Sequence, residues 1–254
     1  MNIDLEKNTE AVKEIGLDEI REEDVFIASY PRSGNSWTRF MIAKMLNPEK
    51  VINLCNIEDH AQDLHTSQKI VNSIKEGRRF IKTHYPRFEL YPKMIYLYRD
   101  GRDVMVSFYH YLYPNFWGRP RFHRFLHQKN DDPFIGSWQN HVTTAFDFAE
   151  RFPERILLIR YEDLLQDTIQ CVKLMAEFCE LSATDQEIKT AVNFCKFENL
   201  QKVERTYGYL EKQKLGFRFF RFGRQNQWRK VFSKKDIKFF ESIAGRTLKR
   251  LNYE

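Results

Sequence analysis

A short apolar run, Asp24–Tyr30 (DVFIASY), leads directly into the loop PRSGNSW and then into a helical pattern from about Ser36 to Leu46. Short apolar runs that alternate with helical patterns are typical of βαβ units in a parallel sheet. Further runs repeat this alternation at Arg79–Thr83, Met94–Tyr98 and Arg155–Arg160. The sequence therefore predicts an α/β fold with a central parallel sheet flanked by helices.

Helical patterns fill much of the remaining sequence. A helix is expected from Asp103 to about Tyr113, and another over Gly136–Phe152. Three more are expected at about Thr168–Cys179, Asp185–Lys196 and Lys234–Leu251. The segment Tyr207–Ser233 is basic and aromatic without a clear period, so we expect an irregular functional loop there. No repeat or Gly/Ser linker interrupts the 254 residues, which are predicted to form a single domain over 1–254.

The ends and the cysteines of the sequence bear on its compartment. The N-terminal segment MNIDLEKNTEAVKEIG is polar and of mixed charge, unlike a signal or transit peptide, and the longest apolar runs are too short to span a bilayer. The four cysteines form no CxxC pair and no metal-ligand spacing: Cys55, Cys171, Cys179 and Cys195. These features predict a cytoplasmic protein with reduced cysteines, no membrane partner and no metal.

The net charge of the chain is +6, which favours an anionic partner without naming one. Nucleic-acid binders usually gather Lys and Arg on one face. In this sequence the basic residues are scattered, and many stand beside acidic ones. A polyphosphorylated nucleotide fits this charge better than nucleic acid does. A non-enzymatic module that binds nucleic acid or another anion stays as an alternative.

The loop after the first predicted strand, Tyr30–Trp37, has the composition of a phosphate cradle. Gly34 allows a ligand to approach the backbone, and Arg32 supplies a fixed positive charge. Side-chain donors are offered by Ser33, Asn35 and Ser36. Successive N–H groups at a helix N-terminus point at a bound anion. A plain strand–turn–helix connection is the structural alternative. A Walker A loop is excluded, because GxxxxGK[ST] is missing, and this disfavours the alternative of a nucleotide-dependent phosphotransferase.

Two more groups of polar residues end the next two predicted strands. Lys82 and His84 share one face of an extended chain, so that His84 can take a proton while Lys82 steadies an anion. Arg99 ends the third strand, and Ser107 lies on the helix that follows. Because ligands bind at the carboxyl ends of strands in open α/β sheets, these side chains are expected to meet. A solvated strand end and an Arg99–Asp103 ion pair are the structural alternatives.

In this order, the three elements resemble the sulfotransferase family that uses 3′-phosphoadenylyl sulfate (PAPS). The family has YPKSGTTW, then KTHLP, then a strand that ends in Arg before a helix with Ser. This chain has YPRSGNSW, then KTHYP at Lys82–Pro86, then YRDGRDVMVSFYH at Tyr98–His110. Three further segments match in order: Gly136–His141 (GSWQNH), Tyr161–Leu164 (YEDL) and Arg221–Trp228 (RFGRQNQW). The likeness covers about residues 25–232, and the Arg-containing loop is similar to that of bacterial members.

The resemblance implies the sulfotransferase and nucleoside-kinase architecture, with a P-loop-like phosphosulfate loop. It also implies transfer of a sulfuryl group from PAPS to a hydroxyl, amine or carbamoyl nitrogen of a small-molecule acceptor, with PAP as product and no metal. His84 is then the general base. Lys82 stabilises the group in flight, and Arg32 stabilises the leaving phosphate.

The same resemblance assigns the nucleotide contacts. Residues 32–37 are implied to hold the 5′-phosphosulfate. The 3′-phosphate is implied to meet Arg99, Ser107, Arg221, Phe222 and the backbone of Gly223. The adenine is implied to lie among Trp37, Tyr161 and Phe197, beside Cys195.

Several positions depart from the family pattern. Arg32 replaces a Lys, so charge stabilisation is kept, whereas an always-protonated guanidinium does not donate a proton to the leaving group. Cys195 replaces a Thr hydroxyl, which weakens one hydrogen bond to the nucleotide, and Phe222 replaces a Lys. The family's C-terminal dimer signature is not kept in Arg229–Lys238, so the oligomeric state stays open.

The acceptor side is indicated by aromatic residues alone. Ten of them lie between Phe108 and Trp138 inclusive, and they either pack in the core or line an acceptor pocket under a lid. Histidines outside the KTH motif are expected to be structural or without a catalytic role: His60, His65, His110, His123, His127 and His141.

Overall fold

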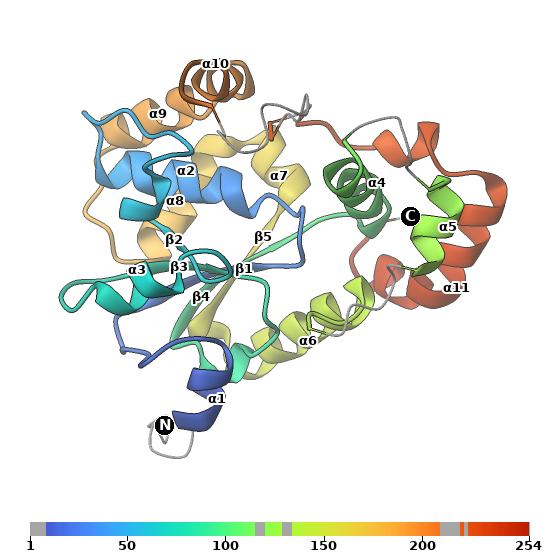
Figure 1. Cartoon of the computed structure of the whole chain (residues 1–254), viewed down its shortest axis with the longest axis horizontal. Helices are drawn as coiled ribbons and strands as arrows, with labels where there is room; N and C mark the ends of the chain where they lie inside the picture. The colour runs from blue at the N-terminus through green and yellow to red at the C-terminus, as the bar shows by residue number, and fades with distance from the viewer. Residues whose placement is uncertain (1–8, 115–119, 129–133, 209–218, 221–222, 254) are drawn as a thin grey trace.

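One parallel sheet runs through the centre of the molecule, with helices on both sides (Figure 1). The computed structural model describes residues 9–114, 120–128, 134–208, 219–220 and 223–253. Among these residues, five strands pair in the order β2-β3-β1-β4-β5. They are β1 Val25–Ser29, β2 Gln62–Asp63, β3 Phe80–Thr83, β4 Lys93–Tyr98 and β5 Ile156–Arg160. The predicted α/β class with a central parallel sheet is confirmed.

Helices connect the strands and cover the sheet. The helices are α1 Thr9–Glu14, α2 Asn35–Leu46, α3 Gln68–Ser73, α4 Gly101–Leu112, α5 Phe122–Gln128, α6 Trp138–Arg151, α7 Tyr161–Gln166, α8 Thr168–Phe178, α9 Asp185–Phe194, α10 Phe197–Tyr207 and α11 Lys234–Arg250. Short 3-10 helices are η1 Ile57–Asp59, η2 Phe88–Leu90, η3 Pro153–Arg155 and η5 Gln227–Lys230. Among the helices of the described residues, none combines the length and apolar composition that crossing a membrane requires.

Every side chain of β1 is buried, which explains why its sequence is apolar rather than alternating. Val25 and Ile27 pack with α2, α8 and α9 on one face of the sheet. Phe26 and Ala28 pack on the other face with residues of α1, α6 and η2. Fully burying one large aliphatic or aromatic side chain contributes about 1.5–3 kcal/mol. The central strand is therefore held firmly from both sides, and the loop that follows it starts from a fixed point.

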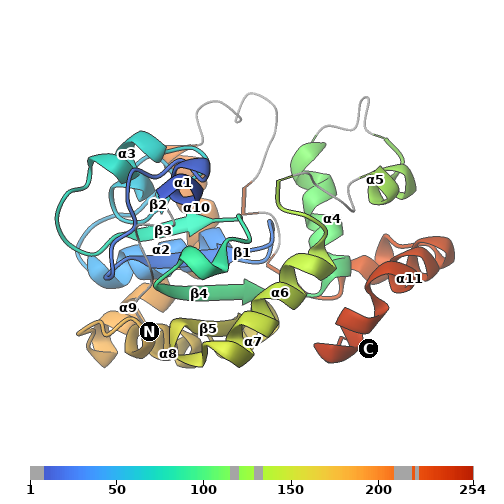
Figure 2. The same cartoon turned by 90° about the horizontal axis from the view of Figure 1, so that it is seen from below.

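The order of the strands places a switch in chain direction at the centre of the sheet. From β1 the chain moves to β2 and returns to β3 beside β1, and then crosses to β4 on the opposite side of β1. Figure 2 shows the strands pointing the same way, with α4 beyond their carboxyl ends. In open α/β sheets ligands bind at such a switch point, outside the carboxyl ends of the strands. The topology thus indicates the edge of the sheet at which the loops of β1, β3 and β4 meet.

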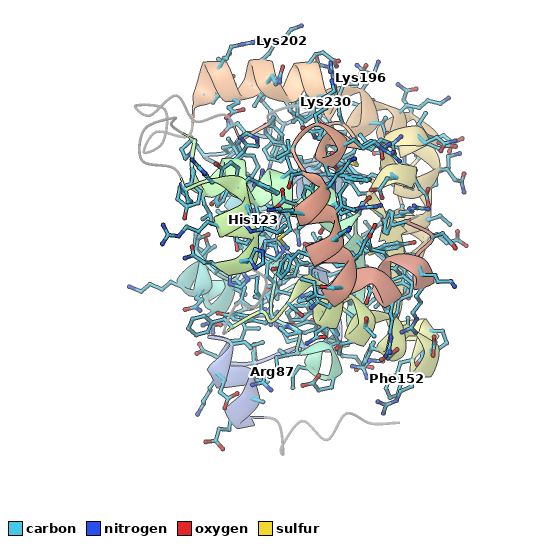
Figure 3. All side chains as sticks on the ribbon, turned by 90° about the vertical axis from the view of Figure 1, so that its right-hand side faces the viewer. Arg87, His123, Phe152, Lys196, Lys202 and Lys230 are labelled. Atoms are coloured by element: carbon cyan, nitrogen blue, oxygen red, sulfur yellow. The ribbon has the colours of Figure 1, made fainter. Side chains whose placement is uncertain are left out.

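A third apolar cluster joins α4, α5, α6 and α11 beside the sheet. The start of α4 packs so tightly on Trp138 that a Cβ at Gly101 would lie 2.5 Å from the indole. On the face of the molecule shown in Figure 3, His123 of α5 lies beside α11, with its Nδ1 atom 2.7 Å from Oδ1 of Asp236. The packing on Trp138 fixes the start of α4, whose first turn faces the carboxyl ends of the strands.

The C-terminal segment is fastened under the turn between β4 and α4. Arg102 donates from Nη2 to the carbonyl oxygen of Tyr253 at 2.7 Å, and its side chain also pairs with Asp100 at 2.8 Å. The Tyr253 hydroxyl donates to Oε2 of Glu162 at 2.8 Å. Glu162 in turn accepts the backbone N–H of Asp100 through Oε1 at 3.2 Å. Residues more than 90 apart in sequence therefore hold this turn together.

The structure corrects the expected elements in particular places. The segment Tyr207–Ser233 is not irregular throughout, because Tyr207 ends α10 and η5 lies further along. Strand β2 has only two residues, too few for an alternating pattern to be detected. The expected helix to Tyr113 ends at Leu112, and the helix expected to continue to Lys196 ends at Phe194. Elements that were not expected are β2, α1, α3, α5, α7 and α10.

Candidate active site

A cavity of about 390 Å³ lies at the carboxyl ends of β1, β3 and β4. Twelve of the predicted site residues line it: Arg32, Gly34, Asn35, Ser36, Trp37, Lys82, His84, Arg99, Ser107, Tyr161, Phe197 and Gly223. Ser33 and Cys195 are buried and are not part of its wall. Arg221 and Phe222 lie outside the described residues. The fold therefore brings together residues that are up to 191 positions apart in the sequence.

The loop between β1 and α2 turns by means of two residues with positive φ. Gly34 has φ of 105°, and Arg32 has φ of 72°, a left-handed conformation that is strained for a residue with a Cβ. Asn35 begins α2 and ties it back to the strand, since its Nδ2 donates to the carbonyl oxygen of Ile27 at 2.8 Å and to Oγ of Ser29 at 3.2 Å. The loop is thus held at both ends while its backbone curves around the cavity.

Several buried polar atoms near this loop have no hydrogen-bond partner among the described residues. They are Oγ of Ser33, Oδ1 of Asn35, Oγ1 of Thr38 and Nε of Arg99. Burying an unsatisfied polar atom costs about 1–3 kcal/mol, so native proteins keep few of them. Their gathering around one loop is the arrangement expected of a site that is completed by a polar, anionic ligand.

Arg32 extends from the loop toward α4. Its Nε donates to Oγ of Ser107 at 3.2 Å, and its guanidinium lies 4.7 Å from the centre of the Tyr111 ring and 5.6 Å from that of Phe219. A planar guanidinium suits both contacts, because it can stack on a ring while it donates in its plane. The positive charge therefore lies on the cavity wall, between the loop and α4.

Arg99 is almost fully buried at the end of β4, with 4% of its surface exposed. Its Nη2 donates to the carbonyl oxygen of Arg224 at 2.9 Å and lies 3.5 Å from Oδ2 of Asp103, while its guanidinium lies 4.2 Å from the Tyr161 ring centre. Oδ1 of the same Asp103 accepts the backbone N–H of Trp228 at 2.9 Å. Arg99 and Asp103 together fasten the loop around Gly223 to the end of the sheet.

Three aromatic residues form one side of the cavity. The indole Nε1 of Trp37 donates to the carbonyl oxygen of Cys195 at 2.8 Å, and its ring meets that of Tyr161 edge-on at 6.1 Å. A Cβ at Gly223 would lie 2.7 Å from the Phe197 ring, so the backbone at Gly223 lies directly against that ring. Cys195 thus contributes a carbonyl oxygen that orients Trp37, rather than a thiol on the wall. Burial raises the pKa of this thiol.

His84 follows β3 and lines the cavity, and one of its ring nitrogens is engaged in a hydrogen bond. Its Nδ1 lies 2.7 Å from the carbonyl oxygen of Ser29, which can only accept, so Nδ1 carries the proton. Burial lowers the pKa of His84 well below its usual value, and the charge of Lys82 and the neighbouring His65 lower it further. The ring is therefore neutral at physiological pH, with a lone pair on Nε2. That is the state a general base requires.

Lys82 lies two residues before His84 in the same wall. Its Nζ donates to Oδ2 of Asp63 at 2.5 Å, and its side chain is 12% exposed. Burial lowers the pKa of Lys82, and the Asp63 carboxylate opposes this effect. An ammonium group therefore stands next to the neutral imidazole of His84 on one side of the cavity.

Sequence reasoning missed Asp63, and it treated His65 as structural without placing it beside His84. Asp63 and His65 both line the cavity. Nε2 of His65 accepts the backbone N–H of His84 at 2.8 Å, and the two rings stack at 5.2 Å. Both residues belong to the region around β2, whose two-residue length left no strand signal in the sequence. The sequence around Asp63 and His65 therefore gave no signal that linked these residues to the Lys-Thr-His motif.

The aromatic segment from Phe108 to Trp138 divides between core and cavity. Phe108 and Tyr111 line the cavity, whereas Tyr109 and Trp138 are buried in the cluster around α4 and α11. Phe134 is 77% exposed. Phe116 and Trp117 lie outside the described residues.

Basic side chains also mark one end of the molecule outside the cavity. Lys196, Lys202 and Lys230 lie toward the same end of the face shown in Figure 3, and Arg87 and Phe152 lie toward the opposite end. Lys196 occupies the position before the first residue of α10, and Lys230 ends η5. Phe197, which directly follows Lys196, lines the cavity. Such basic groups attract an anion toward this end of the protein.

The cavity thus combines an anion cradle, buried cations and a neutral imidazole. The loop after β1 and the side chains of Arg32, Arg99 and Lys82 can hold a multiply charged anion. His84 can take a proton from a neighbouring hydroxyl or amine. Among the described residues, no group of three or more His, Cys, Asp or Glu side chains is arranged to hold a metal ion. The chemistry that this set of side chains supports is transfer of an anionic group.

Comparison with known proteins agrees with this chemistry. A family model described as the sulfotransferase domain matches residues 22–252. Sulfotransferase 2A6 of Rattus norvegicus is 27% identical over 250 residues, which cover 88% of this chain and 84% of that protein. Flavonol 4′-sulfotransferase of Flaveria chlorifolia is 28% identical and covers 84% of this chain and 75% of its own. A solved retinol dehydratase in complex with retinol and PAP has a similar fold, with a TM-score of 0.74, 22% identity, and coverage of 96% of this chain and 86% of that one.

Proposed function

Since this chain belongs to the sulfotransferase family, we propose that it moves a sulfuryl group from PAPS to a hydroxyl or nitrogen of a small-molecule acceptor. The observation that supports this most directly is that one cavity is lined by the neutral His84, by Lys82 and by the loop with Gly34. The solved relative with retinol and PAP was bound to the product of such a donor. Flavonol 4′-sulfotransferase takes its name from a small-molecule acceptor.

The proposed reaction is a single in-line displacement. Nε2 of His84 removes the proton from the acceptor hydroxyl or amine, and the freed oxygen or nitrogen attacks sulfur. The bond between sulfur and the bridging oxygen of PAPS breaks, so that the sulfate ester or sulfamate and PAP leave and the proton stays on His84. Arg32 and Lys82 neutralise the charge that develops on the sulfuryl oxygens and on the leaving phosphate.

The nucleotide contacts follow from the walls of the cavity. Backbone N–H groups of residues 32–37 are proposed to hold the 5′-phosphosulfate, with Oγ of the buried Ser33 as a further group near the loop. Arg99 and Ser107 are proposed to bind the 3′-phosphate, and the adenine to lie among Trp37, Tyr161 and Phe197. Arg221, Phe222 and the backbone of Gly223 are proposed to complete the 3′-phosphate site, and Cys195 is proposed to act beside the adenine through its carbonyl oxygen.

We further propose that the reaction takes place in the cytoplasm. All four cysteines are free, and Cys171, Cys179 and Cys195 are buried. Burial raises the pKa of Cys171 to about 11 and of Cys179 to about 12, so these thiols stay protonated. Unpaired cysteines of this kind are usual in a reducing compartment.

Binding of PAP tests the proposal without knowledge of the acceptor. PAP at 100 times its dissociation constant is expected to stabilise the protein by about 2.7 kcal/mol, which raises Tm by about 5–10 °C for a chain of this size. Mg-ATP at the same concentration is expected to leave Tm unchanged, because it lacks the 3′-phosphate. The measurement is a thermal-shift titration with PAP, Mg-ATP and adenosine 5′-phosphosulfate in parallel. An equal shift with Mg-ATP would contradict the proposal and favour a phosphotransferase.

Gly34→Ala is expected to weaken PAP binding more than it weakens the fold. The added Cβ lies 2.8 Å from Cδ2 of Tyr161, so the ring proposed to frame the adenine must move. The positive φ adds about 1–2 kcal/mol of backbone strain. Gly77→Ala is the matched control, because it has φ of 74° and meets nothing within 4 Å. Calorimetric titration with PAP is expected to show weaker binding only in Gly34→Ala, whereas denaturant unfolding is expected to show the backbone strain in both variants and a further loss from the Tyr161 contact in Gly34→Ala. Equal PAP affinities in the two variants would refute the role given to this loop.

A further inference from the structure

A cluster of four charged side chains, which includes Lys82, lies on the side of the cavity away from Arg99. It consists of Arg39 on α2, Glu58 on η1, Asp63 on β2 and Lys82 on β3. Arg39 is only 6% exposed, and its Nη2 lies 2.7 Å from Oε1 of Glu58. The two cations and two carboxylates balance, so the cluster is formally neutral. A buried neutral cluster of this kind is stable only while each charge keeps its partner.

Asp63 is joined by hydrogen bonds to Lys82, His65 and Glu58. Oδ2 accepts from Nζ of Lys82 at 2.5 Å, and Oδ1 accepts the backbone N–H of His65 at 3.1 Å. Its own backbone N–H donates to Oε2 of Glu58 at 2.7 Å. One carboxylate therefore contacts the lysine of the KTH motif directly and also fixes the residue that stacks on the histidine of that motif.

Asp63 is also connected to His84, through His65. Its ring stacks on His84 at 5.2 Å with an angle of 21° between the planes, and its Nε2 accepts the His84 backbone N–H at 2.8 Å. Since Nε2 accepts, the proton of the neutral ring is on Nδ1. Burial lowers the pKa of His65 to about 4, so this tautomer persists at neutral pH. The ring that contacts His84 therefore belongs to a residue whose backbone N–H is bound by Asp63.

We propose that Asp63 is a positioning residue for the transfer reaction, which keeps the Lys82 ammonium charged and directed into the cavity and seats His65 against His84. The inference deepens the proposed function and rests on it for the roles of Lys82 and His84. Asp63 itself touches no reacting atom, because its carboxylate acts through Lys82 and His65.

The charged surroundings of Lys82 explain why a carboxylate is needed there. The titratable and charged groups that face its ammonium from the packed elements are Asp63, Arg39, Glu58, His65 and His84. Burial lowers the pKa of Lys82, and Arg39 lowers it further, whereas Asp63 raises it most among the neighbours. Without Asp63 the buried amine tends to lose its proton, and a neutral amine cannot stabilise charge on the sulfuryl group.

Because Asp63 is paired with cations, its negative charge repels the anionic donor less. Burial alone would raise the pKa of this carboxyl, yet Lys82 and Arg39 hold the pKa below its usual value, so the group is ionised at neutral pH. An unpaired carboxylate on the cavity wall would repel the sulfuryl group. Within the cluster of Arg39, Glu58, Asp63 and Lys82 its charge is balanced, and it still orients the lysine.

The test compares Asp63→Asn with the wild-type enzyme over a range of pH. In the variant the alkaline limb of the kcat profile is expected to move to lower pH by about one unit or more, because Lys82 loses its proton earlier. At neutral pH kcat is expected to fall by up to about 100-fold, because the lysine and the histidine lose their exact placement. KM for PAPS is expected to change little. Asp63→Glu restores the carboxylate and is expected to return the alkaline limb to the wild-type pH.

Two controls separate this role from a purely structural one. Asp59→Asn removes an exposed carboxylate four residues away and is expected to leave both kcat and the pH profile unchanged. In a Lys82→Met background, Asp63→Asn is expected to add less than its separate effect, because both changes act on one interaction. Full additivity, or an alkaline limb that stays in place in Asp63→Asn, overturns the proposal.

The protonation of Lys82 can also be measured directly, without knowledge of the acceptor. The titration of the Lys82 ammonium is followed by NMR in protein labelled at lysine, with Lys82→Met identifying its signal. The signal is expected to titrate at lower pH in Asp63→Asn than in the wild type and Asp63→Glu. If PAP fails to bind the wild type, the proposed function is wrong, whereas an unchanged Lys82 titration shows that the inference about Asp63 is wrong. If Asp63→Asn does not fold, Asp63→Ser takes its place in both measurements.

Discussion

Replacing His84 with alanine is expected to lower kcat by about 10²- to 10⁴-fold, the loss typical of a missing general base. The reason lies in the tautomer, because Nδ1 donates to the Ser29 carbonyl oxygen and leaves the lone pair of Nε2 for the acceptor. The affinity for PAP is expected to stay within a few-fold of wild type, since the proposed nucleotide contacts lie elsewhere. Single-turnover kinetics with PAPS and equilibrium titration with PAP measure the two quantities.

The pH profile gives a second check on His84. A base works in its unprotonated form, and burial lowers the pKa of His84 well below its usual value. The acid limb of the profile is therefore expected below pH 6.5, and turnover is expected to be steady between pH 7 and about 6. His123→Ala is the matched control, because that ring is 54% exposed on α5. Wild-type turnover in the His84 variant, or an acid limb at or above pH 6.5, would contradict the assignment.

Replacing Arg99 with methionine is expected to weaken PAP binding by about 30-fold to several thousand-fold. The guanidinium is nearly buried beside Tyr161 and is proposed to pair with the 3′-phosphate. Truncating one partner of a buried, hydrogen-bonded charge pair costs about 2–5 kcal/mol, and each 1.4 kcal/mol is a factor of ten. Titration calorimetry with PAP measures the change directly.

Comparison of two nucleotides separates the proposed role of Arg99 from its structural one. Adenosine 5′-monophosphate lacks the 3′-phosphate, so its affinity is expected to be similar in the wild type and in Arg99→Met. Arg224→Met removes an exposed charge in the same loop and is expected to change PAP affinity by less than ten-fold. If Arg99→Met weakened both nucleotides equally, Arg99 would serve the shape of the loop through Asp103 rather than the 3′-phosphate.

The sequence predicted the elements that carry strong local signals. The apolar run of β1 is buried on both faces, and the loop after it contains the glycine that a positive φ demands, so both were visible without a structure. Lys82, His84 and Arg99 were predicted because each ends a strand, and the topology brings such ends to one edge of the sheet. The family resemblance then assigned their roles, which spacing alone left open.

The residues that sequence reasoning missed are those placed by tertiary contacts. Asp63 belongs to a strand of two residues, and its proposed role depends on its contact with Lys82 on β3. His65 resembles any other histidine until its ring is seen against His84. Cys195 is buried with its side chain in the core, and its carbonyl oxygen accepts from Trp37, a contact that the sequence did not indicate. Such choices depend on packing that no local pattern encodes.

The fastening of Tyr253 beneath the β4–α4 turn has a consequence for synthesis on the ribosome. The phosphate loop emerges early, but Arg102 and Glu162 obtain their Tyr253 partners only after 219 further residues have followed Gly34. At about 5–20 residues per second, that interval is roughly 10–45 s. The last of the described strands, β5, ends at Arg160, so all five strands have been synthesised well before Tyr253 completes this clamp. We therefore expect the nascent chain to acquire nucleotide-binding competence in a single late step.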